Sequence, residues 1–186
     1  MIRILSGKYK GRKLNYFNLD ALRPTQAKIR KSMMDTLMPI NNKDVLDLFA
    51  GVGSLGIEAI SRGAKSVYFI DKNPKAINIL KKNLNMLNLE EKVKVKILDV
   101  FKFLKKTDLK FDLVIADPPY YKYNFEDLLV LIEPILNDGG VFCFESHKAE
   151  IENSKYVKIK NYGNTQLVFW RKKWKKELYT PVHSIR

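Results

Sequence analysis

The chain has 186 residues, of which 46% are hydrophobic and 29% are charged, a balance typical of a globular protein. This length favours one domain with a sizeable core. No apolar run approaches the roughly 20 residues that a membrane-spanning helix needs, and Lys8 and Lys10 come too early for a signal peptide. We therefore expect a cytoplasmic protein without a membrane partner.

The net charge of +14, from 34 Lys and Arg against 20 Asp and Glu, favours a polyanionic partner. Each Lys or Arg that meets a phosphate releases condensed counterions, so basic proteins bind nucleic acids readily. Charge alone leaves a second interpretation open, because a lysine-rich protein with solvated surfaces has the same composition.

Few residues in the chain have the chemistry of a metal site. The single cysteine, Cys143, excludes an internal disulfide and a cysteine cluster, and its apolar neighbours predict a buried thiol. His147 and His183 have no acidic or cysteine partner at ligand spacing. We expect no metal.

The N-terminal part, residues 1–40, differs in character from the rest. Short strands are predicted at 2–5 and 12–17, around two glycines, as in a hairpin. Apolar residues at helical spacing predict a helix over 26–38, which Thr25 can cap and Pro39 ends.

From Asp44 onward, strands alternate with helices. Repeated strand–helix units imply a parallel sheet with helices on both faces, and a closing hairpin makes part of it antiparallel. The predicted fold class is therefore α/β, Rossmann-like, with the mostly parallel seven-stranded sheet expected of class I S-adenosylmethionine methyltransferases. The predicted strands are 45–49, 67–70, 93–98, 111–116, 141–145, 156–160 and 166–170, and the predicted helices end near 60 or span 73–87 and 125–136.

A glycine-rich segment, Asp47 to Gly56, follows the first of these strands and spells G-x-G-x-x-G before a helix. Glycine there permits positive φ and lets a ligand approach the backbone closely. Nicotinamide dinucleotide domains and S-adenosylmethionine domains both use the motif, and a tight packing turn can also produce it. We assign Phe49, Gly51 and Gly53 to a cofactor site.

Acidic residues stand at three neighbouring strand ends. Asp71 ends the second strand, where a carboxylate accepts hydrogen bonds from both ribose hydroxyls of a cofactor. Asp99 ends the third strand, where it can face an adenine amine with Val100 or Phe101 against the ring, and it can also cap a helix. Asp47 argues against a dinucleotide, because a carboxylate just before the loop is poorly placed beside a pyrophosphate. It is well placed to orient the loop and the cationic end of S-adenosylmethionine, our predicted cofactor.

The run Asp117-Pro118-Pro119-Tyr120 follows the fourth strand, at the sheet edge where ligands of this fold bind. An exocyclic base amine is a poor nucleophile, because its lone pair is delocalised into the ring. The Asp117 carboxylate and the Pro118 carbonyl can accept its two hydrogens and aim the lone pair at a methyl group. Tyr120 offers an aromatic face for a flipped-out base. The alternative is a plain proline turn. The glycine loop makes that alternative less favoured, so we predict that these four residues are catalytic.

These motifs carry a resemblance that covers nearly the whole chain. The sequence resembles the bacterial RsmD-type methyltransferases, which act on a guanine N2 amine of small-subunit (16S) ribosomal RNA. The family commonly has an acid after the helix arginine, where this chain has Lys31 after Arg30. The matching segments are Gly7 to Leu14, Leu22 to Thr25, Asp47 to Gly56, Glu58-Ala59, Ser61 to Ala64, Asp117 to Tyr120 and Tyr162 to Thr165.

The resemblance implies an S-adenosylmethionine-dependent enzyme that methylates guanine N2 in 16S rRNA. It implies that residues 1–40 bind RNA and close over the cofactor, with Thr25 at a helix N-terminus contacting the methionine carboxylate. Residues 41–174 then form the methyltransferase domain, and 175–186 form a tail that can be disordered. We expect a monomer that acts on an assembled or partly assembled small subunit. The residues assigned to RNA contact are Lys8, Lys10, Arg12, Arg23 and Arg30.

Three other functions stay open at the level of sequence. An adenine-N6 DNA methyltransferase shares the Asp-Pro-Pro-Tyr logic, although the chain lacks an obvious sequence-reading domain. A catalytically silent RNA-binding assembly module would bind RNA without turnover. A nicotinamide-dependent oxidoreductase is supported by the glycine loop alone.

Overall fold

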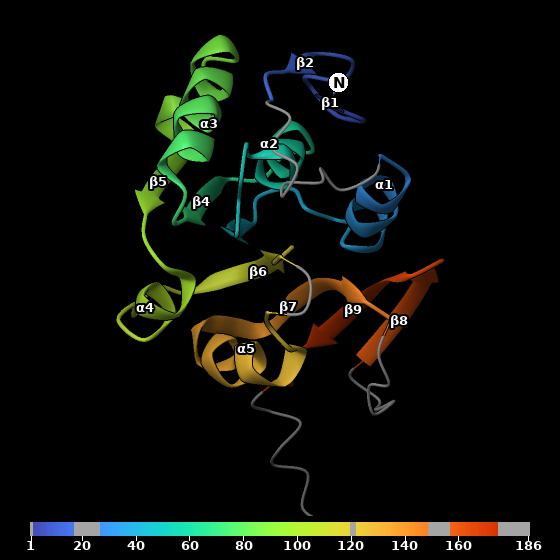
Figure 1. The fold of residues 1–186 in the computed structure, drawn as a ribbon. Helices are drawn as coiled ribbons and strands as arrows, with labels where there is room; N and C mark the ends of the chain where they lie inside the picture. The colour runs from blue at the N-terminus through green and yellow to red at the C-terminus, as the bar shows by residue number, and fades with distance from the viewer. Residues whose placement is uncertain (1, 17–26, 120–121, 149–156, 175–186) are drawn as a thin grey trace, which may run out of the picture.

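A seven-stranded sheet runs through the centre of the protein (Figure 1). The structure is a computed structural model that describes residues 2–16, 27–119, 122–148 and 157–174. Its strands are β3 (Asp44–Leu48), β4 (Ser66–Asp71), β5 (Val93–Ile97), β6 (Phe111–Ala116), β7 (Leu136–His147), β8 (Val157–Tyr162) and β9 (Thr165–Arg171). The spatial order is β5-β4-β3-β6-β7-β9-β8. Strands β3 to β7 pair in parallel, and β9 pairs antiparallel with β7 and β8.

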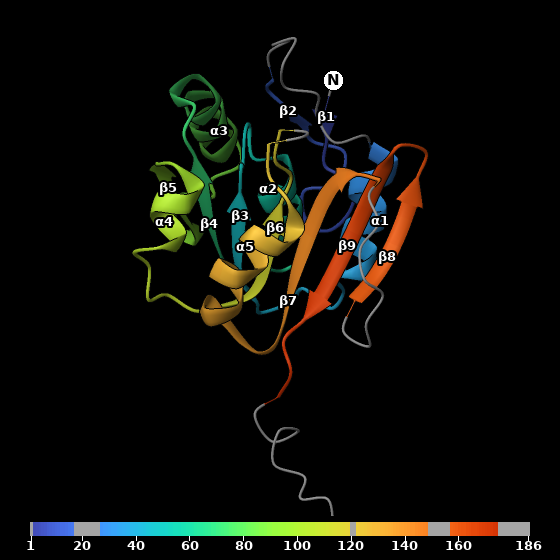
Figure 2. The ribbon, with the colours of Figure 1, turned by 60° about the horizontal axis from the view of Figure 1, so that its bottom comes forward.

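Helices cover both faces of the sheet, as the sequence predicts (Figure 2). One face carries α1 (Ala27–Thr36), α2 (Ser54–Ser61) and α3 (Pro74–Met86), and the other carries α4 (Val100–Leu104) and α5 (Phe125–Ile132). Each layer buries its own apolar cluster against the sheet, which is why the central strands are apolar on both sides. No helix of the described residues is both long and apolar enough to cross a membrane.

Several elements form where the local sequence predicts them most strongly. The side chain of Asn73 accepts hydrogen bonds from the backbone N–H groups of Lys75 and Ala76, and Pro74 opens α3, as predicted. Lys94 and Lys96 are exposed on β5, and Val93 and Val95 are half-buried, so this part of the predicted strand alternates between exposed and partly covered residues.

The region after α5 differs from the prediction. The helix expected over 125–136 ends at Ile132 and continues as a 3-10 turn, Glu133–Ile135, since Pro134 lacks the N–H that an α-helix needs. Strand β7 then begins at Leu136 and runs through both glycines that were expected to end the helix. Gly139 adopts φ +73°, and the register between β6 and β7 shifts nearby, so the glycines form an irregularity within a strand.

The short helix α4 was not predicted as an element. It spans only five residues, too few to show a helical stripe, and its sequence Val-Phe-Lys-Phe-Leu also suits a strand. Tertiary packing decides between the two, because Phe103 and Leu104 are buried in the cluster beneath α5.

The chain begins with a two-stranded hairpin, as predicted, with shorter strands. Strand β1 (Ile2–Arg3) pairs antiparallel with β2 (Lys13–Leu14). Ile2, Ile4 and Leu14 are buried in the same apolar cluster as α1 and α2. The N-terminal hairpin, residues 2–16, therefore shares a core with one face of the sheet.

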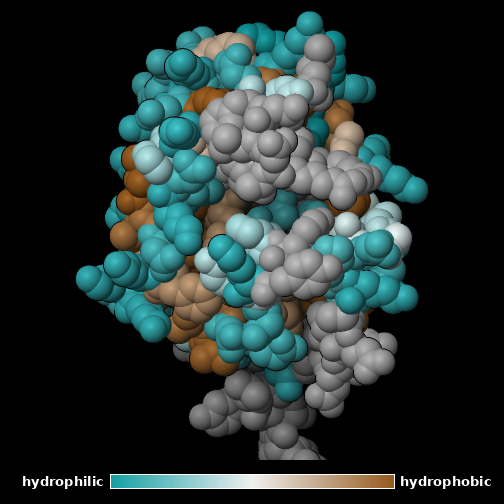
Figure 3. Space-filling view, viewed as in Figure 1, coloured by the Kyte–Doolittle hydropathy of each residue, from teal (hydrophilic) through white to brown (hydrophobic). Residues whose placement is uncertain are grey.

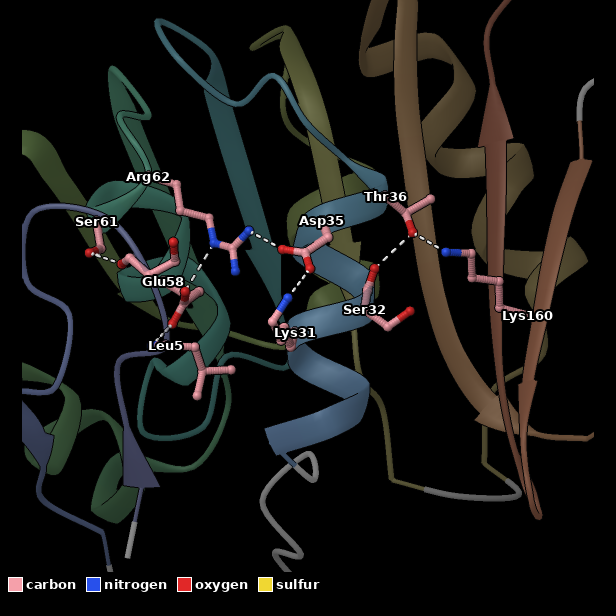
Figure 4. Close-up of polar contacts among 10 residues, drawn as sticks. Leu5, Lys31, Ser32, Asp35, Thr36, Glu58, Ser61, Arg62 and Lys160 are labelled. Atoms are coloured by element: carbon pink, nitrogen blue, oxygen red, sulfur yellow. Dashed lines mark hydrogen bonds and ion pairs between the residues drawn. The ribbon is translucent and has the colours of Figure 1, made fainter.

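Polar contacts join this hairpin to α2 and α1 (Figure 4). The fully buried Glu58 accepts hydrogen bonds from the Leu5 N–H at 2.7 Å and from Arg62 Nε at 3.0 Å. Arg62 also reaches Asp35 at 2.7 Å, and Asp35 pairs with Lys31 one turn earlier on α1. Hydrogen bonds from Lys31 and Arg62 hold the pKa of Asp35 below its ordinary value. The lysine that departs from the family pattern is thus an exposed end of this network.

We expect the two carboxylates of this network to differ in their contribution to stability. Glu58→Ala leaves the Leu5 N–H without its acceptor and leaves Arg62 with Asp35 as its remaining carboxylate partner, and removing one partner of a buried pair costs about 3–5 kcal/mol. Asp35 is largely exposed, so Asp35→Ala should cost less than about 1 kcal/mol. Urea unfolding measures both free energies. Equal losses would show that Glu58 does not anchor the hairpin.

Candidate cofactor and substrate site

The sheet brings the predicted site segments to one edge. The glycine loop follows β3, Asp71 ends β4, Asp99 follows β5 and Asp117 follows β6. These four strands are parallel, so their carboxyl ends point the same way, and ligands of open α/β sheets bind at that edge. The structure thus brings together the segments that were predicted to hold the cofactor and the target base.

The conformation of the glycine loop depends on its two glycines. Gly51 and Gly53 adopt φ values of +55° and +85°, and the intervening turn is closed by a 2.8 Å bond from the Gly53 N–H to the Ala50 carbonyl. A Cβ on Gly53 would lie 2.2 Å from Leu80 Cδ1 on α3, so a larger residue does not fit there. Among the described residues, the atom nearest to a Cβ on Gly51 would be the Phe49 carbonyl oxygen at 4.0 Å, so a ligand can approach this backbone closely.

Asp71 connects β4 to this loop. Its Oδ2 accepts a hydrogen bond from the Gly51 N–H at 2.8 Å, and its Oδ1 accepts one from the Asn73 N–H at 2.8 Å. A carboxylate has about four acceptor positions, so these bonds leave one on each oxygen. The two remaining acceptor positions can therefore accept hydrogen bonds from two ribose hydroxyls, while the same side chain orients the loop.

Asp47 lies beneath the loop and is 1% exposed. Its Oδ2 accepts a 2.8 Å hydrogen bond from the Gly56 N–H in the first turn of α2. Burial raises the pKa of Asp47 to about 8; the Gly56 N–H opposes this shift, and the negative charges of Asp117 and Asp71 add to it. So deep a carboxylate orients the loop and does not reach a ligand's surface directly.

Asp99 caps α4, the alternative role weighed from the sequence. Its Oδ1 accepts hydrogen bonds from the Phe101 N–H at 3.0 Å and from the Lys102 N–H at 3.2 Å. The Val100 side chain is buried among residues beneath α5, whereas Phe101 is only half-buried. Of the two residues considered for contact with an adenine ring, Phe101 keeps the larger accessible apolar surface.

An aromatic cluster at this edge was not predicted. Tyr123 stacks on Phe101 with ring centroids 5.6 Å apart, and it lies 4.7 Å from the ring of Phe49. Phe49 has φ +58°, a conformation that is uncommon for a bulky residue. The cluster joins the loops after β3 and β6 to the start of α4, and no pattern in the sequence pairs Tyr123 with residues so distant in the chain.

The Asp117-Pro118-Pro119 segment leaves β6 at the centre of the edge. Asp117 is half-buried, Pro118 is buried and Pro119 is exposed. The Asp117 charge raises the pKa of Asp47 and contributes to the raised pKa of the buried Cys143, whose main cause is burial. Leu48 and Ala116 are neighbours in the parallel register of β3 and β6, so the glycine loop and Asp117 leave adjacent strands at the same edge. Tyr120 lies outside the described residues.

Three of the predicted RNA-contacting residues are exposed on the N-terminal hairpin: Lys8, Lys10 and Arg12. The backbone between the strands is fixed by Ser61, whose carbonyl accepts from the Lys8 N–H at 2.8 Å and whose Oγ accepts from the Tyr9 N–H at 3.0 Å. The loop is therefore ordered by α2 while its cationic side chains face solvent.

Arg30 lies in a different place from the one expected of an RNA contact. It is 3% exposed, and its Nη2 donates a 2.7 Å hydrogen bond to the Arg3 carbonyl. Burial lowers its pKa, and the charge of Glu58 opposes that shift. We correct the assignment: Arg30 holds the first strand of the hairpin against α1. Arg23 and Thr25 lie outside the described residues, as does the tail 175–186.

Comparison with known proteins identifies the family. A family model described as conserved hypothetical protein 95 matches residues 2–171. The ribosomal RNA small subunit methyltransferase D of Haemophilus influenzae is 41% identical over 135 residues, which cover 70% of each chain. The chain belongs to the methyltransferase D family. The resemblance that the sequence motifs carried is thereby confirmed.

Two further proteins extend the match. Protein YlbH of Bacillus subtilis is 34% identical over 184 residues, 92% of this chain and 100% of that protein. The structure of yhhF from Escherichia coli superposes with a TM-score of 0.81 at 29% identity, covering 92% of this chain and 98% of that one. The predicted class I methyltransferase fold is confirmed.

The raised pKa of Asp47 has a consequence for stability. Between the ordinary carboxyl pKa of 3.8 and about 8, the folded protein binds this proton more tightly than the unfolded chain. The contribution is fully present below about pH 4 and is lost as the pH rises through about 8. Asp47→Asn mimics the protonated form, so its free energy of unfolding relative to the unmodified chain should increase from about pH 5 to about pH 9. A difference that stays constant in urea titrations would contradict the raised pKa.

Proposed function

We propose that the protein is an S-adenosylmethionine-dependent methyltransferase that acts on the exocyclic N2 amine of a guanine in small-subunit (16S) rRNA. The observation that carries this proposal is the meeting of the glycine loop, Asp71, Asp99 and Asp117 at one sheet edge in a chain of the methyltransferase D family. Relatives from Haemophilus influenzae and Escherichia coli are both named ribosomal RNA small subunit methyltransferase D, which supports rRNA as the substrate.

Different residues at the edge contact different parts of the cofactor. The remaining acceptor positions of Asp71 receive the ribose hydroxyls, and Asp99 with Phe101 borders the adenine. Beneath the methionine end, Asp47 holds the end of the loop through Gly56, and Asp71 holds Gly51. Thr25, from the N-terminal part, is assigned to the methionine carboxylate. When bound, S-adenosylmethionine supplies an electrophilic methyl group on a sulfonium centre.

The residues after β6 orient the target. The Asp117 carboxylate and the Pro118 carbonyl accept the two hydrogens of the base amine, which leaves its lone pair directed toward the methyl group. With S-adenosylmethionine bound, the methyl group would pass from its sulfur to the nitrogen, leaving neutral S-adenosylhomocysteine, and the methylated nitrogen would lose one proton to solvent. Asp117 would stabilise the positive charge that develops before that proton leaves. Pro119 rigidifies the segment, and Tyr120 provides the ring on which the flipped guanine stacks.

The substrate form follows from the size of the recognition surface. Only about 40 residues stand outside the catalytic core, too few for much direct reading of sequence, so recognition depends on RNA shape. We infer that the protein acts as a monomer in the cytoplasm on an assembled or partly assembled small subunit. Ribosomal proteins would fix the RNA shape that naked rRNA does not hold.

A methyl-transfer assay tests the function. The protein is incubated with labelled S-adenosylmethionine and, separately, with small subunits from cells that lack the enzyme, naked rRNA and duplex DNA. We expect label in guanine N2 of the subunits. Asp117→Ala should lower turnover by about 100-fold or more, while affinity for S-adenosylhomocysteine stays nearly unchanged because Asp117 contacts the base. Label in adenine N6 of DNA, with none in rRNA, would overturn the substrate.

The basic residues of the N-terminal hairpin yield a prediction about RNA affinity. Replacing Lys8, Lys10 and Arg12 together by glutamine should weaken rRNA binding and flatten its salt dependence. Each lost phosphate contact should reduce the log–log slope by about 0.7–0.9. The fold should survive, because these side chains are exposed. Fluorescence anisotropy across a salt series measures the slope.

A matched triple variant controls for net charge. Lys43, Lys105 and Lys106 are equally exposed and lie outside the hairpin, so their replacement by glutamine removes the same charge. This variant should keep a slope near that of the unmodified chain. Equal flattening in both variants would assign binding to overall charge and remove the hairpin from the RNA site.

A further inference from the structure

A buried amide lies between the N-terminal hairpin and the glycine loop. Asn83 is on α3 with its side chain fully buried, although it is polar. Its Oδ1 accepts a 2.7 Å hydrogen bond from the Asn15 N–H, and its Nδ2 donates to the Asn15 carbonyl at 3.0 Å. The same Nδ2 donates to the Val52 carbonyl at 3.1 Å. Both hydrogens and the oxygen of one amide are therefore engaged.

The geometry at Asn15 resembles the pairing of two strands. One amide bonds both the N–H and the C=O of a single residue, as a neighbouring strand would, so it fixes that residue's position and orientation. Asn15 directly follows β2, and thus ends the hairpin that carries Lys8, Lys10 and Arg12. The hairpin cannot shift along α3 without breaking both bonds.

The third bond reaches the cofactor side. Val52 lies between Gly51 and Gly53, both of which have positive φ values. Glycine is the residue that changes such angles most freely, so a fixed carbonyl at position 52 restrains the loop. The loop that faces the cofactor and the hairpin that faces the RNA therefore share one hydrogen-bonding group.

Other contacts of the hairpin end on helices. Leu5 bonds Glu58 on α2, and Arg12 Nη2 donates to the Met86 carbonyl near the end of α3 at 3.3 Å. These contacts hold the hairpin to the body of the protein without reaching the glycine loop. The Asn83 amide is in direct contact with both.

We propose that Asn83 is a positioning residue that couples RNA binding at the N-terminal hairpin to cofactor binding at the glycine loop. The inference rests on the proposed function, which supplies the two ligands. Ordering the loop around the cofactor fixes Val52, which fixes the amide and with it the hairpin. Such coupling is reciprocal, so RNA on the hairpin strengthens cofactor binding by the same factor.

The test compares Asn83→Ala with Asn85→Ala, a matched control that removes an exposed amide from the same helix. Affinity of the full chain for S-adenosylhomocysteine is measured by calorimetry, with and without saturating small ribosomal subunits from cells that lack the enzyme. The unmodified chain and Asn85→Ala should show affinities raised about fivefold or more by the RNA. In Asn83→Ala this ratio should fall to near one, while either ligand still binds alone. A ratio that is unchanged in Asn83→Ala, or near one in the unmodified chain, overturns the coupling.

A second variant addresses a possible folding defect of Asn83→Ala. Asn15→Pro deletes the backbone N–H that Oδ1 accepts and leaves α3 intact. Position 15 is exposed, and Leu14 lies in β2, where the extended conformation suits a residue before proline. The same loss of the ratio is expected, with an unchanged circular dichroism spectrum.

Hydrogen exchange separates this inference from the proposed function, because it needs no ligand. In the protein alone, Asn83→Ala should speed exchange of both the hairpin end (residues 13–16) and the loop (residues 51–54), and Asn85→Ala should change neither. Faster exchange in the hairpin with an unaltered loop overturns the coupling. Failure of the unmodified chain to bind S-adenosylhomocysteine or rRNA overturns the proposed function, whatever the exchange shows.

Discussion

The hydrogen bond from the Gly56 N–H to the buried carboxylate of Asp47 sets how closely α2 approaches the sheet. A Cβ at position 56 would lie 2.2 Å from the ring of Phe69 and 2.9 Å from Asp47 Oδ2, so helix and strands touch with no room for a side chain. The bond satisfies an N–H in the first turn of α2, where helices lack backbone acceptors. It also fixes the start of α2, and thereby the end of the glycine loop.

The N-terminal hairpin depends on that same helix. Glu58 and Ser61, one and two turns further along α2, bond the backbone at Leu5 and Tyr9. Gly7 passes so close that a Cβ there would lie 1.8 Å from the Ser61 carbonyl. The helix that begins at the cofactor loop therefore carries the hairpin at its other end. Both proposed binding surfaces take their positions from one element, which favours a rigid relation between them.

The sequence could predict the features that depend on interactions between residues close together in the chain. Elements coded by neighbouring residues, such as the Asn73-Pro74 start of α3 and the alternating strand β5, were predicted with nearly correct bounds. Arg30 was misassigned because a helical stripe defines an apolar face without showing which charged residue lies at its border. Periodicity on α1 could not reveal that its guanidinium turns inward to the Arg3 carbonyl.

Contacts that span long stretches of chain could not be predicted at all. Helical spacing from Leu80 places Asn83 on the buried face of α3, but its partners lie 68 and 31 positions away, and no local pattern shows which residues it bonds. Tyr123 likewise gains its role from Phe49 and Phe101, which the sheet topology places beside it. The strand order, which brings β3 between β4 and β6, creates these neighbours.

The distribution of charge gives the proposed site its selectivity. The protein carries a net charge of +14, yet Asp47, Asp71, Asp99 and Asp117 gather at one sheet edge. Burial is the main cause of the raised pKa of Asp47, and the charges of Asp117 and Asp71 add to it. Such an edge attracts a cationic sulfonium and repels phosphate, while the basic hairpin attracts phosphate. An RNA strand bound by its phosphates at the hairpin would thus place only a neutral base near the acidic residues. This charge distribution favours a flipped-out nucleotide.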